Sequence, residues 1–260
     1  LSAFIWGPDG WLYGGQGCFV RSFVGRPGAG PGERVKFSGG VWRYHPVKRR
    51  FEVFAEGTSN PWGVDFDDRG QAFSTTCVIA HLFHSIQGGR YQLQVGSHPN
   101  PYTYGDIRTI ADHYHWLGAG GLRAGSGYSA AAGGGNAHCG AMLYLGDNFP
   151  ESYRGKLLFS NIHGARVNMD ILEPKGSGFV GRHGKDFLLA NDRWSQIINL
   201  RYGPDGAVWV IDWYDKQQCH DVRPDVHDLS NGRIFRVAYK TPPVVKVDLY
   251  AAELGELGNF

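Results

Sequence analysis

A tight-turn sequence that recurs four times along the chain is the feature that most restricts its fold. Residues 6–13 read WGPDGWLY and residues 202–209 read YGPDGAVW, so in both an apolar segment meets a Pro-Asp-Gly turn and then a second apolar segment. Residues 66–73 and 151–159 repeat the arrangement more weakly. Proline at the second turn position and glycine at the fourth are typical of a type I turn. We therefore predict four β-hairpins at these places.

The spacing of these turns predicts the architecture. The turn glycines, Gly10, Gly70, Gly155 and Gly206, are 60, 85 and 51 residues apart, which suits a four-stranded blade with insertions of variable length. Glycine makes up 39 of 260 residues and aromatic residues 14%, which argues against a coiled coil or a helical solenoid. The sequence predicts an all-β protein, a β-propeller of four-stranded antiparallel blades, with four blades visible.

The predicted blades divide the chain into consecutive segments. They comprise residues 1–57, 58–115, 136–191 and 192–240. Outer hairpins are expected between 41–44 and 51–54 and between 166–170 and 187–189. A glycine-rich loop at 116–135 is interpreted as a linker or as a loop that covers a ligand. Residues 241–260 read as a linker followed by the start of a helical segment.

Charge and cysteine content exclude several classes of protein. The formal net charge is +2 and no basic stripe appears, so nucleic acid is not an expected partner. No apolar run approaches the ~18 residues that a membrane-spanning helix needs. The four cysteines contain no CxxC pair, so a haem attachment motif and a zinc ribbon are absent from this sequence.

The hairpin pattern predicts a binding site at one end of the propeller channel. In each hairpin the start of the first strand and the end of the second lie at the same edge. These positions hold polar and aromatic residues that either form a ligand pocket or cap the strand ends. They are Asn60, His138, Asp192 and Trp194 at strand starts, and Gln16, Thr75, Thr76, Asn161, His163, Asp212, Trp213 and Tyr214 at strand ends.

Several motifs resemble one family of propellers. They are NPWG at 60–63, HCGAMLYLGDNFP at 138–150, NIHG at 161–164, NDRW at 191–194, DWYD at 212–215 and NGRIFRV at 231–237. Over roughly residues 3–240 the chain resembles the soluble quinoprotein glucose and sorbosone dehydrogenase superfamily. The closer resemblance is to its planctomycete-type branch of large membrane-bound dehydrogenases. The resemblance implies a six-bladed propeller, a periplasmic or extracellular location, and a cytochrome or another electron acceptor as partner. Since the repeats supply four blades, we expect the sequence to be part of a longer protein.

The same resemblance implies pyrroloquinoline quinone (PQQ) with calcium as the cofactor, but the matching positions differ. The family's catalytic histidine would precede the strand at 3–6, where this sequence begins. Its cofactor-binding arginine matches Ser59 and its lysine matches His163, and its calcium loop falls near 75–77, which has no carboxylate. Because PQQ carries three carboxylates, the loss of these cations argues against its binding in the same way.

Candidate roles follow for individual residues. His163, His138 and Asp192 are the candidate catalytic residues, since a histidine with an orienting aspartate can act as a base toward a sugar hydroxyl. A divalent metal bound by His138, His163 and Asp212 is the alternative use of this site. Candidate substrate-binding residues are Asn60, Trp194, Asp212, Trp213 and Tyr214.

Four other histidines are expected on the surface or in loops. His113 and His115 are two residues apart and would share one face of an extended strand, whereas His81 and His84 would share one face of a helix.

Three functions remain open from the sequence. The first is an extracytoplasmic dehydrogenase that oxidises a sugar or related alcohol. The second is a metal-assisted carbohydrate hydrolase or lyase. The third is a propeller that binds a carbohydrate or a protein without catalysis. Trp194, Trp213 and Tyr214 near the channel suit the stacking of a sugar in all three, so the aromatic residues do not distinguish these functions.

Overall fold

The computed structural model describes residues 2–77, 80–99, 104–113, 115, 137–216 and 227–241. Within these residues nearly all regular structure is β, and helix is limited to two short 3-10 segments, Pro31–Glu33 and Glu151–Tyr153. The prediction of an all-β propeller is confirmed. The number of blades in the ring stays a prediction. Across the described part of the chain, none of the helical segments has the length and apolar character that a bilayer crossing requires.

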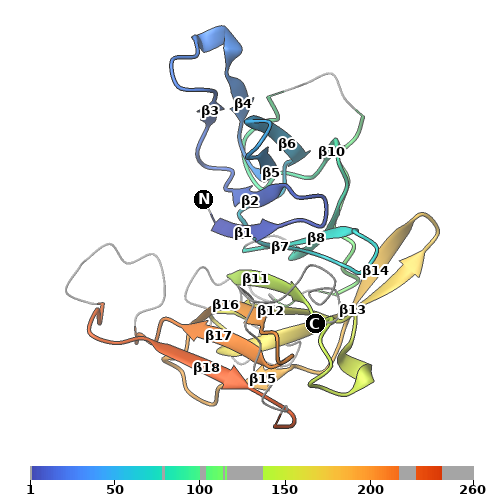
Figure 1. The fold of residues 1–260 in the computed structure, drawn as a ribbon, viewed down its shortest axis with the longest axis vertical. Coiled ribbons are helices and arrows are strands. Elements are labelled where there is room, and N and C mark those ends of the chain that lie inside the picture. Colours follow the sequence, from blue (N-terminus) through green and yellow to red (C-terminus); the bar gives the residue numbers. More distant parts are fainter. Residues whose placement is uncertain are drawn as a thin grey trace, which may run out of the picture.

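Four sheets, antiparallel except for one short strand, follow one another along the chain (Figure 1). The first contains β1 (Ser2–Trp6), β2 (Leu12–Gln16), β5 (Gly40–His45), β6 (Arg50–Glu56) and the short parallel strand β10 (Gly89–Arg90). The second contains β7 (Pro61–Phe66), β8 (Ala72–Thr76) and β9 (Leu82–Ser85). A separate hairpin, β3 (Ser22–Val24) and β4 (Val35–Phe37), extends from the first sheet.

The third and fourth sheets form the other half of the described molecule. The third contains β11 (His138–Leu143), β12 (Leu157–Asn161), β13 (Arg166–Lys175), β14 (Gly178–His183) and β15 (Leu188–Leu189). The fourth contains β16 (Ile197–Tyr202), β17 (Val208–Asp212) and β18 (Arg233–Val237). Figure 1 shows β7 and β8 between the first sheet and the third.

The repeated turns form as predicted because their side chains satisfy the backbone. The amide of Gly10 donates to the carbonyl of Gly7 at 3.0 Å, and Gly206 donates to Gly203 at 2.9 Å. The Asp205 carboxylate accepts the amide of Ala207 at 3.0 Å. All four turn glycines have a left-handed φ between 69° and 77°, which glycine adopts without steric cost.

One outer hairpin differs from the prediction. The short strand β15 does pair with the start of β13, but most of β13 pairs with β14 through a tight turn at Gly176. Gly176 has a φ of 59°, and no proline or aspartate in this turn marks it as a hairpin in the sequence.

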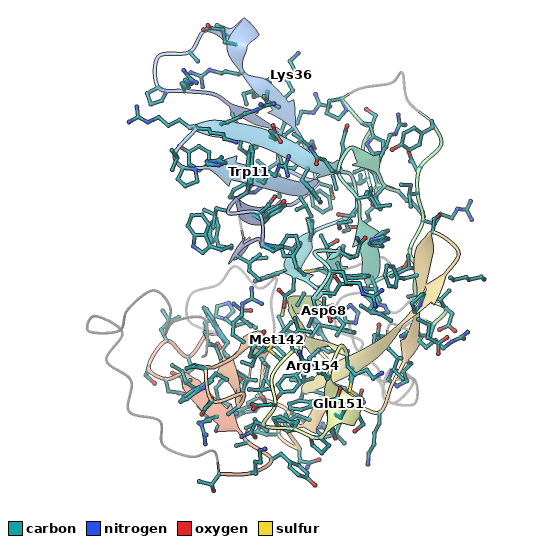
Figure 2. The ribbon with its side chains drawn as sticks, turned by 45° about the vertical axis from the view of Figure 1, so that its right-hand side comes forward. Trp11, Lys36, Asp68, Met142, Glu151 and Arg154 are labelled. Atoms are coloured by element: carbon teal, nitrogen blue, oxygen red, sulfur yellow. The ribbon has the colours of Figure 1, made fainter. Side chains whose placement is uncertain are left out.

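The hydrophobic core lies in three layers between successive sheets. The inner strands contact one another in the order β1, β7, β11, β16. Along β11 the side chains alternate, so Ala141 and Leu143 pack toward the second sheet while Met142 packs toward the fourth. Figure 2 shows Trp11 in the upper half and Met142 in the lower half, in separate core layers.

Candidate functional site

Three histidines surround one buried carboxylate between the second and third sheets. Asp170 lies on β13 and is fully buried, and Val167 and the partly buried Met169 of the same strand pack in the core between the third and fourth sheets. His81 directly precedes β9, and its carbonyl accepts the amide of Thr76 at 2.9 Å. His113 and His115 follow a segment that pairs with Leu82 on one side and Gly181 on the other. We call these four residues, His81, His113, His115 and Asp170, the histidine cluster.

The donor atoms of the histidine cluster converge on the carboxylate. His81 Nε2 lies 2.6 Å from Asp170 Oδ2. His113 Nε2 and His115 Nε2 each lie 3.3 Å from Asp170 Oδ1 and 3.1 Å from one another. All four potential ligand atoms are within 4.8 Å of one another. A carboxylate oxygen and imidazole nitrogens in this arrangement suit a divalent transition metal.

The cluster is closed on one side and reaches solvent on the other. The side chains of His81, His115 and Asp170 are at most 1% exposed, whereas His113 is 17% exposed. Phe159 packs against the inner side, with its ring centroid 5.2 Å from that of His81. The exposed His183 lies at the outer side, 4.9 Å from His115 between ring centroids.

His138, a predicted catalytic residue, belongs to the wall of this cluster. It is 2% exposed, and its ring centroid lies 5.2 Å from that of His81 and 5.5 Å from that of His115. Its ring nitrogens are buried, and the backbone of Thr76 is a polar neighbour.

Burial and charge give the cluster residues different protonation states. Burial lowers the pKa of His81 to about 4 against the opposing effect of Asp170. Burial, followed by His81 and His115, holds the pKa of His138 well below its usual value. Burial raises the pKa of Asp170, but its contacts with the three histidines outweigh burial and hold that pKa well below the usual range. At neutral pH the carboxylate is therefore ionised while His81 and His138 are neutral.

An outer ion pair orients the solvent-facing histidine. His113 Nδ1 lies 3.0 Å from Asp112 Oδ1, and Arg182 donates to the other oxygen of Asp112 at 2.7 Å. Burial lowers the pKa of His113, but Asp170 and Asp112 outweigh burial and raise it. Contact of one ring nitrogen with Asp112 turns the other ring nitrogen toward Asp170, as is common for metal-bound histidines.

Several other predicted residues come together in a second group around Arg233. The Arg233 guanidinium donates through Nε to Asp212 Oδ2 at 3.0 Å and lies 3.3 Å from Asp192 Oδ2. It also stacks on Tyr214, with 3.6 Å between the guanidinium carbon and the ring centroid. Trp194 packs beside Tyr214 at 5.7 Å between ring centroids. We call Arg233, Asp192, Asp212, Tyr214 and Trp194 the arginine group.

Within the arginine group the carboxylate of Asp212 already has many partners. Besides Arg233 it accepts the Ser195 hydroxyl at 3.0 Å, the Gln196 amide at 2.6 Å and the Tyr214 amide at 3.1 Å. Tyr214 has a φ of 41°, a left-handed conformation that is uncommon for a side-chain-bearing residue and that these contacts hold in place.

The remaining predicted site residues lie just before or just after a strand. Trp213 follows β17 and is 45% exposed. His163 follows β12 and is buried at 8% exposure, and Asn60 precedes β7 with its carbonyl accepting the amide of Cys77 at 3.1 Å. The prediction that His81 and His84 share a helix is wrong, since His84 lies in strand β9 and His81 immediately before it.

The histidine cluster was missed for an identifiable reason. The pair His113 and His115 was expected at the surface, yet His115 is 1% exposed. The two-residue spacing of this pair on an extended segment is a usable sequence signal for paired ligands, because both side chains then lie on one face. Asp170 between apolar neighbours, with Met169 before it and Ile171 and Leu172 after it, was a second signal, because an aspartate is seldom fully buried unless it is paired.

The comparisons with known proteins support the fold. A family model described as "Domain of unknown function (DUF7133)" matches residues 1–241. A crystal structure of glucose dehydrogenase is similar at 17% identity with a TM-score of 0.56, covering 91% of this chain and 63% of that one. The PQQ-bound aldose sugar dehydrogenase of Streptomyces coelicolor is similar at 16% identity and a TM-score of 0.54, covering 90% and 61%. No curated protein sequence matches.

A third similar structure is the apo form of the soluble aldose sugar dehydrogenase of Escherichia coli. The identity is 16% and the TM-score 0.50, with 80% of this chain and 59% of that chain covered. The chain thus spans about 63% of the length of the glucose dehydrogenase that it matches.

The residues present do not fit PQQ at the positions that the resemblance assigns to it. Ser59 is fully buried and its hydroxyl is bonded to Gln94. The hydroxyls of Thr75 and Thr76 donate to the carbonyls of Gly140 at 3.0 Å and Ala80 at 3.2 Å. These side chains are uncharged and already bonded, so they offer neither cations for the PQQ carboxylates nor carboxylates for calcium.

Proposed function

The chain belongs to the family described as "Domain of unknown function (DUF7133)", and we propose that it forms part of an oxidoreductase of the sugar dehydrogenase type. Its substrate is a sugar or a related alcohol, of which one hydroxyl group is oxidised. Its place of action is the periplasm or the cell exterior, and a cytochrome or similar carrier receives the electrons.

The observation that carries this proposal is the likeness of fold over 91% of the chain to a glucose dehydrogenase. The exposed rings beside the arginine group add to it, because Trp194 is 46% and Trp213 45% exposed. Flat aromatic faces next to hydrogen-bonding groups suit the binding of a sugar ring. In this proposal the substrate contacts are Asn60, Trp194, Asp212, Trp213 and Tyr214.

The chemistry requires a base and an electron acceptor. Oxidation of an alcohol to a carbonyl passes the hydroxyl proton to a base and a hydride to a bound cofactor. His163 and His138 are the candidate bases, with Asp192 as the orienting carboxylate. Burial keeps the pKa of His138 well below its usual value, so its imidazole is neutral but accepts a proton less readily than an exposed histidine does. The cofactor is not PQQ held through an arginine and a lysine at the family positions, because Ser59 and His163 stand there.

A dye-linked assay tests the proposal. The protein is incubated with aldoses and sugar alcohols, an artificial electron acceptor, and either PQQ with Ca²⁺ or Zn²⁺, Mn²⁺ or Fe²⁺. We expect dye reduction with at least one sugar or sugar alcohol. In Trp213→Ala the KM for that substrate should rise roughly 5- to 10-fold, because about 1–1.5 kcal/mol of stacking is lost.

Trp209→Ala is the matched control for that substitution. Trp209 is 43% exposed and lies near the start of β17, whereas Trp213 follows the end of that strand. The substitution Trp209→Ala should therefore leave KM unchanged. Absence of dye reduction under every cofactor condition would refute the oxidoreductase.

The histidine cluster favours a second candidate, a metal-assisted carbohydrate hydrolase or lyase. A metal bound by neutral imidazoles and a carboxylate activates water or polarises a substrate oxygen without any electron acceptor. Cleavage of oligosaccharides without dye, abolished by EDTA and restored by Zn²⁺ or Mn²⁺, would identify this activity. Unchanged oligosaccharides after incubation with Zn²⁺ and Mn²⁺ would exclude it.

A further inference from the structure

We propose that His113 Nε2, His115 Nε2 and Asp170 Oδ1 form the three-ligand face of a binding site for one divalent first-row transition-metal ion, and that His81 is a positioning residue that holds Asp170. This site does not depend on sugar oxidation, and it differs from the predicted metal set of His138, His163 and Asp212.

The spacing of the three atoms is the first argument. Their separations of 3.1, 3.3 and 3.3 Å make a nearly equilateral triangle. Ligands about 2.0–2.1 Å from one ion are separated by about 3.3 Å in a tetrahedral site and by about 3.0 Å at adjacent octahedral positions. An ion above this triangle would therefore meet all three ligand atoms at ordinary bond lengths without rearrangement of the backbone.

The chemistry of the atoms is the second argument. Two imidazole nitrogens and a carboxylate oxygen suit zinc, iron or manganese, whereas calcium and magnesium prefer sites built from oxygen. The other oxygen of Asp170 is occupied by His81 Nε2 at 2.6 Å, which fixes the carboxylate plane. Asp112 holds the outer nitrogen of His113 at 3.0 Å. Such outer contacts are the usual support of metal ligands.

The access to solvent on one side of the cluster is a third argument. The half-buried His113 and the exposed His183 lie on the side from which an ion and an exchangeable ligand would enter.

Without an ion, the three close contacts among His113 Nε2, His115 Nε2 and Asp170 Oδ1 cannot all be good hydrogen bonds. If His113 and His115 both donate from Nε2 to Asp170 Oδ1, their two hydrogens meet across 3.1 Å between the nitrogens. If one donates to the other, one nitrogen loses its contact with the carboxylate. An ion in place of those hydrogens lets both nitrogens present lone pairs to the same point.

Metal analysis of the purified chain tests the proposal. The protein is stripped with EDTA and titrated with Co²⁺, whose visible absorption reports imidazole and carboxylate coordination. We expect one ion per chain, displaced by Zn²⁺. In His113→Ala and in His115→Ala the Co²⁺ affinity should fall at least 100-fold. His113→Ala removes a side chain at the solvent edge, so this variant should fold even if substitution of buried Asp170 does not.

His84→Ala is the matched control, because His84 is buried in the adjoining strand and contacts Phe73, Phe179 and Gln71 but not the cluster. It should keep full Co²⁺ binding. His81→Gln can still donate to Asp170, so it should bind Co²⁺ more tightly than His81→Ala. Absence of a Co²⁺ spectrum in the parent protein, or equal binding by the His113→Ala, His115→Ala and parent proteins, would overturn the site.

Discussion

At the scale of single residues, the buried charges of this protein are stabilised by specific partners from neighbouring loops and strands. The Asp212 side chain is fully buried, and the Arg233 guanidinium that neutralises it comes from β18. The Asp170 side chain is equally buried and depends on three imidazoles. Removal of the partner of either carboxylate should destabilise the folded protein, because a buried charge without a partner is far less stable than a solvated one.

Loss of Arg233 should therefore be costly. We expect Arg233→Ala to lower the free energy of unfolding by about 3 kcal/mol, since it leaves the Asp212 carboxylate buried and without its cation. Arg236→Ala on the same strand removes an exposed pair with Asp205 and should cost less than about 1 kcal/mol. Urea unfolding of both variants measures the difference. Equal losses would mean that Arg233 contributes no more than a surface ion pair.

Asp65 predicts a pH dependence of stability. Burial raises the pKa of Asp65 to about 6, against the smaller opposing effects of Arg201 and the amides of Phe66 and Leu143. Because the folded pKa exceeds the unfolded one, this residue's contribution to stability is fully present below about pH 4 and is lost as the pH rises through 6. The parent protein therefore loses unfolding free energy between pH 4 and pH 7, whereas Asp65→Asn does not. The stability of Asp65→Asn relative to the parent should rise by on the order of 2 kcal/mol over this range.

Chemical unfolding at both pH values tests this prediction. Asp68→Asn, an exposed residue of the following turn that Figure 2 labels, corrects for the removal of one negative charge. A difference between Asp65→Asn and the parent that does not change with pH would contradict the prediction.

At the scale of elements, the inner strands of neighbouring sheets approach so closely that glycine is required. A Cβ at Gly63 on β7 would lie 2.4 Å from the carbonyl carbon of Gly140 and 2.5 Å from the amide nitrogen of Ala141 on β11. Backbone atoms cannot move aside as a flexible side chain can. Glycine at position 63 therefore allows β7 and β11, and with them the second and third sheets, to approach each other closely.

Gly63→Ala should lower the unfolding free energy by about 3 kcal/mol, because the added methyl forces the two strands apart. Gly178→Ala on β14 is the control, since its nearest neighbour would be the Lys175 carbonyl at 4.0 Å and no strain arises. It should change stability by less than about 0.5 kcal/mol. A similar small effect of both substitutions, measured by thermal unfolding, would show that the strands separate easily.

At the scale of the whole molecule, the proposed metal would tie separate parts of the chain together. Its ligands come from β13 of the third sheet and from the segment that packs between β9 and β14. An ion that binds only the folded chain stabilises all of it by mass action.

Addition of Zn²⁺ at 100 times its Kd should raise Tm by roughly 5–10 °C, as expected for about 2.7 kcal/mol in a chain of this size. The double variant His113→Ala, His115→Ala should show no such shift. A scanning calorimeter measures both, and an equal shift in the double variant would place the stabilising ion elsewhere.

The sequence by itself determined the strands and their turns. The Pro-Asp-Gly turns at Gly10 and Gly206 require only a left-handed glycine and a nearby aspartate, and both are local properties of the backbone. The alternation along β11 likewise determined which residues face each core layer. For the same reason the strand-end positions of Asp212 and Tyr214 could be predicted, whereas their partner Arg233 could not.

Only the tertiary structure decided where the buried polar groups meet. His81 and Asp170 are 89 residues apart, and His115 and Asp170 are 55 apart. Their contact depends on the distance between the second and third sheets and on the segment that pairs with Leu82 on one side and Gly181 on the other. No local preference specifies these distances, because they arise from the packing of whole sheets across Gly63 and Phe159. The two-residue spacing of His113 and His115 was visible in the sequence, but their shared carboxylate required the fold.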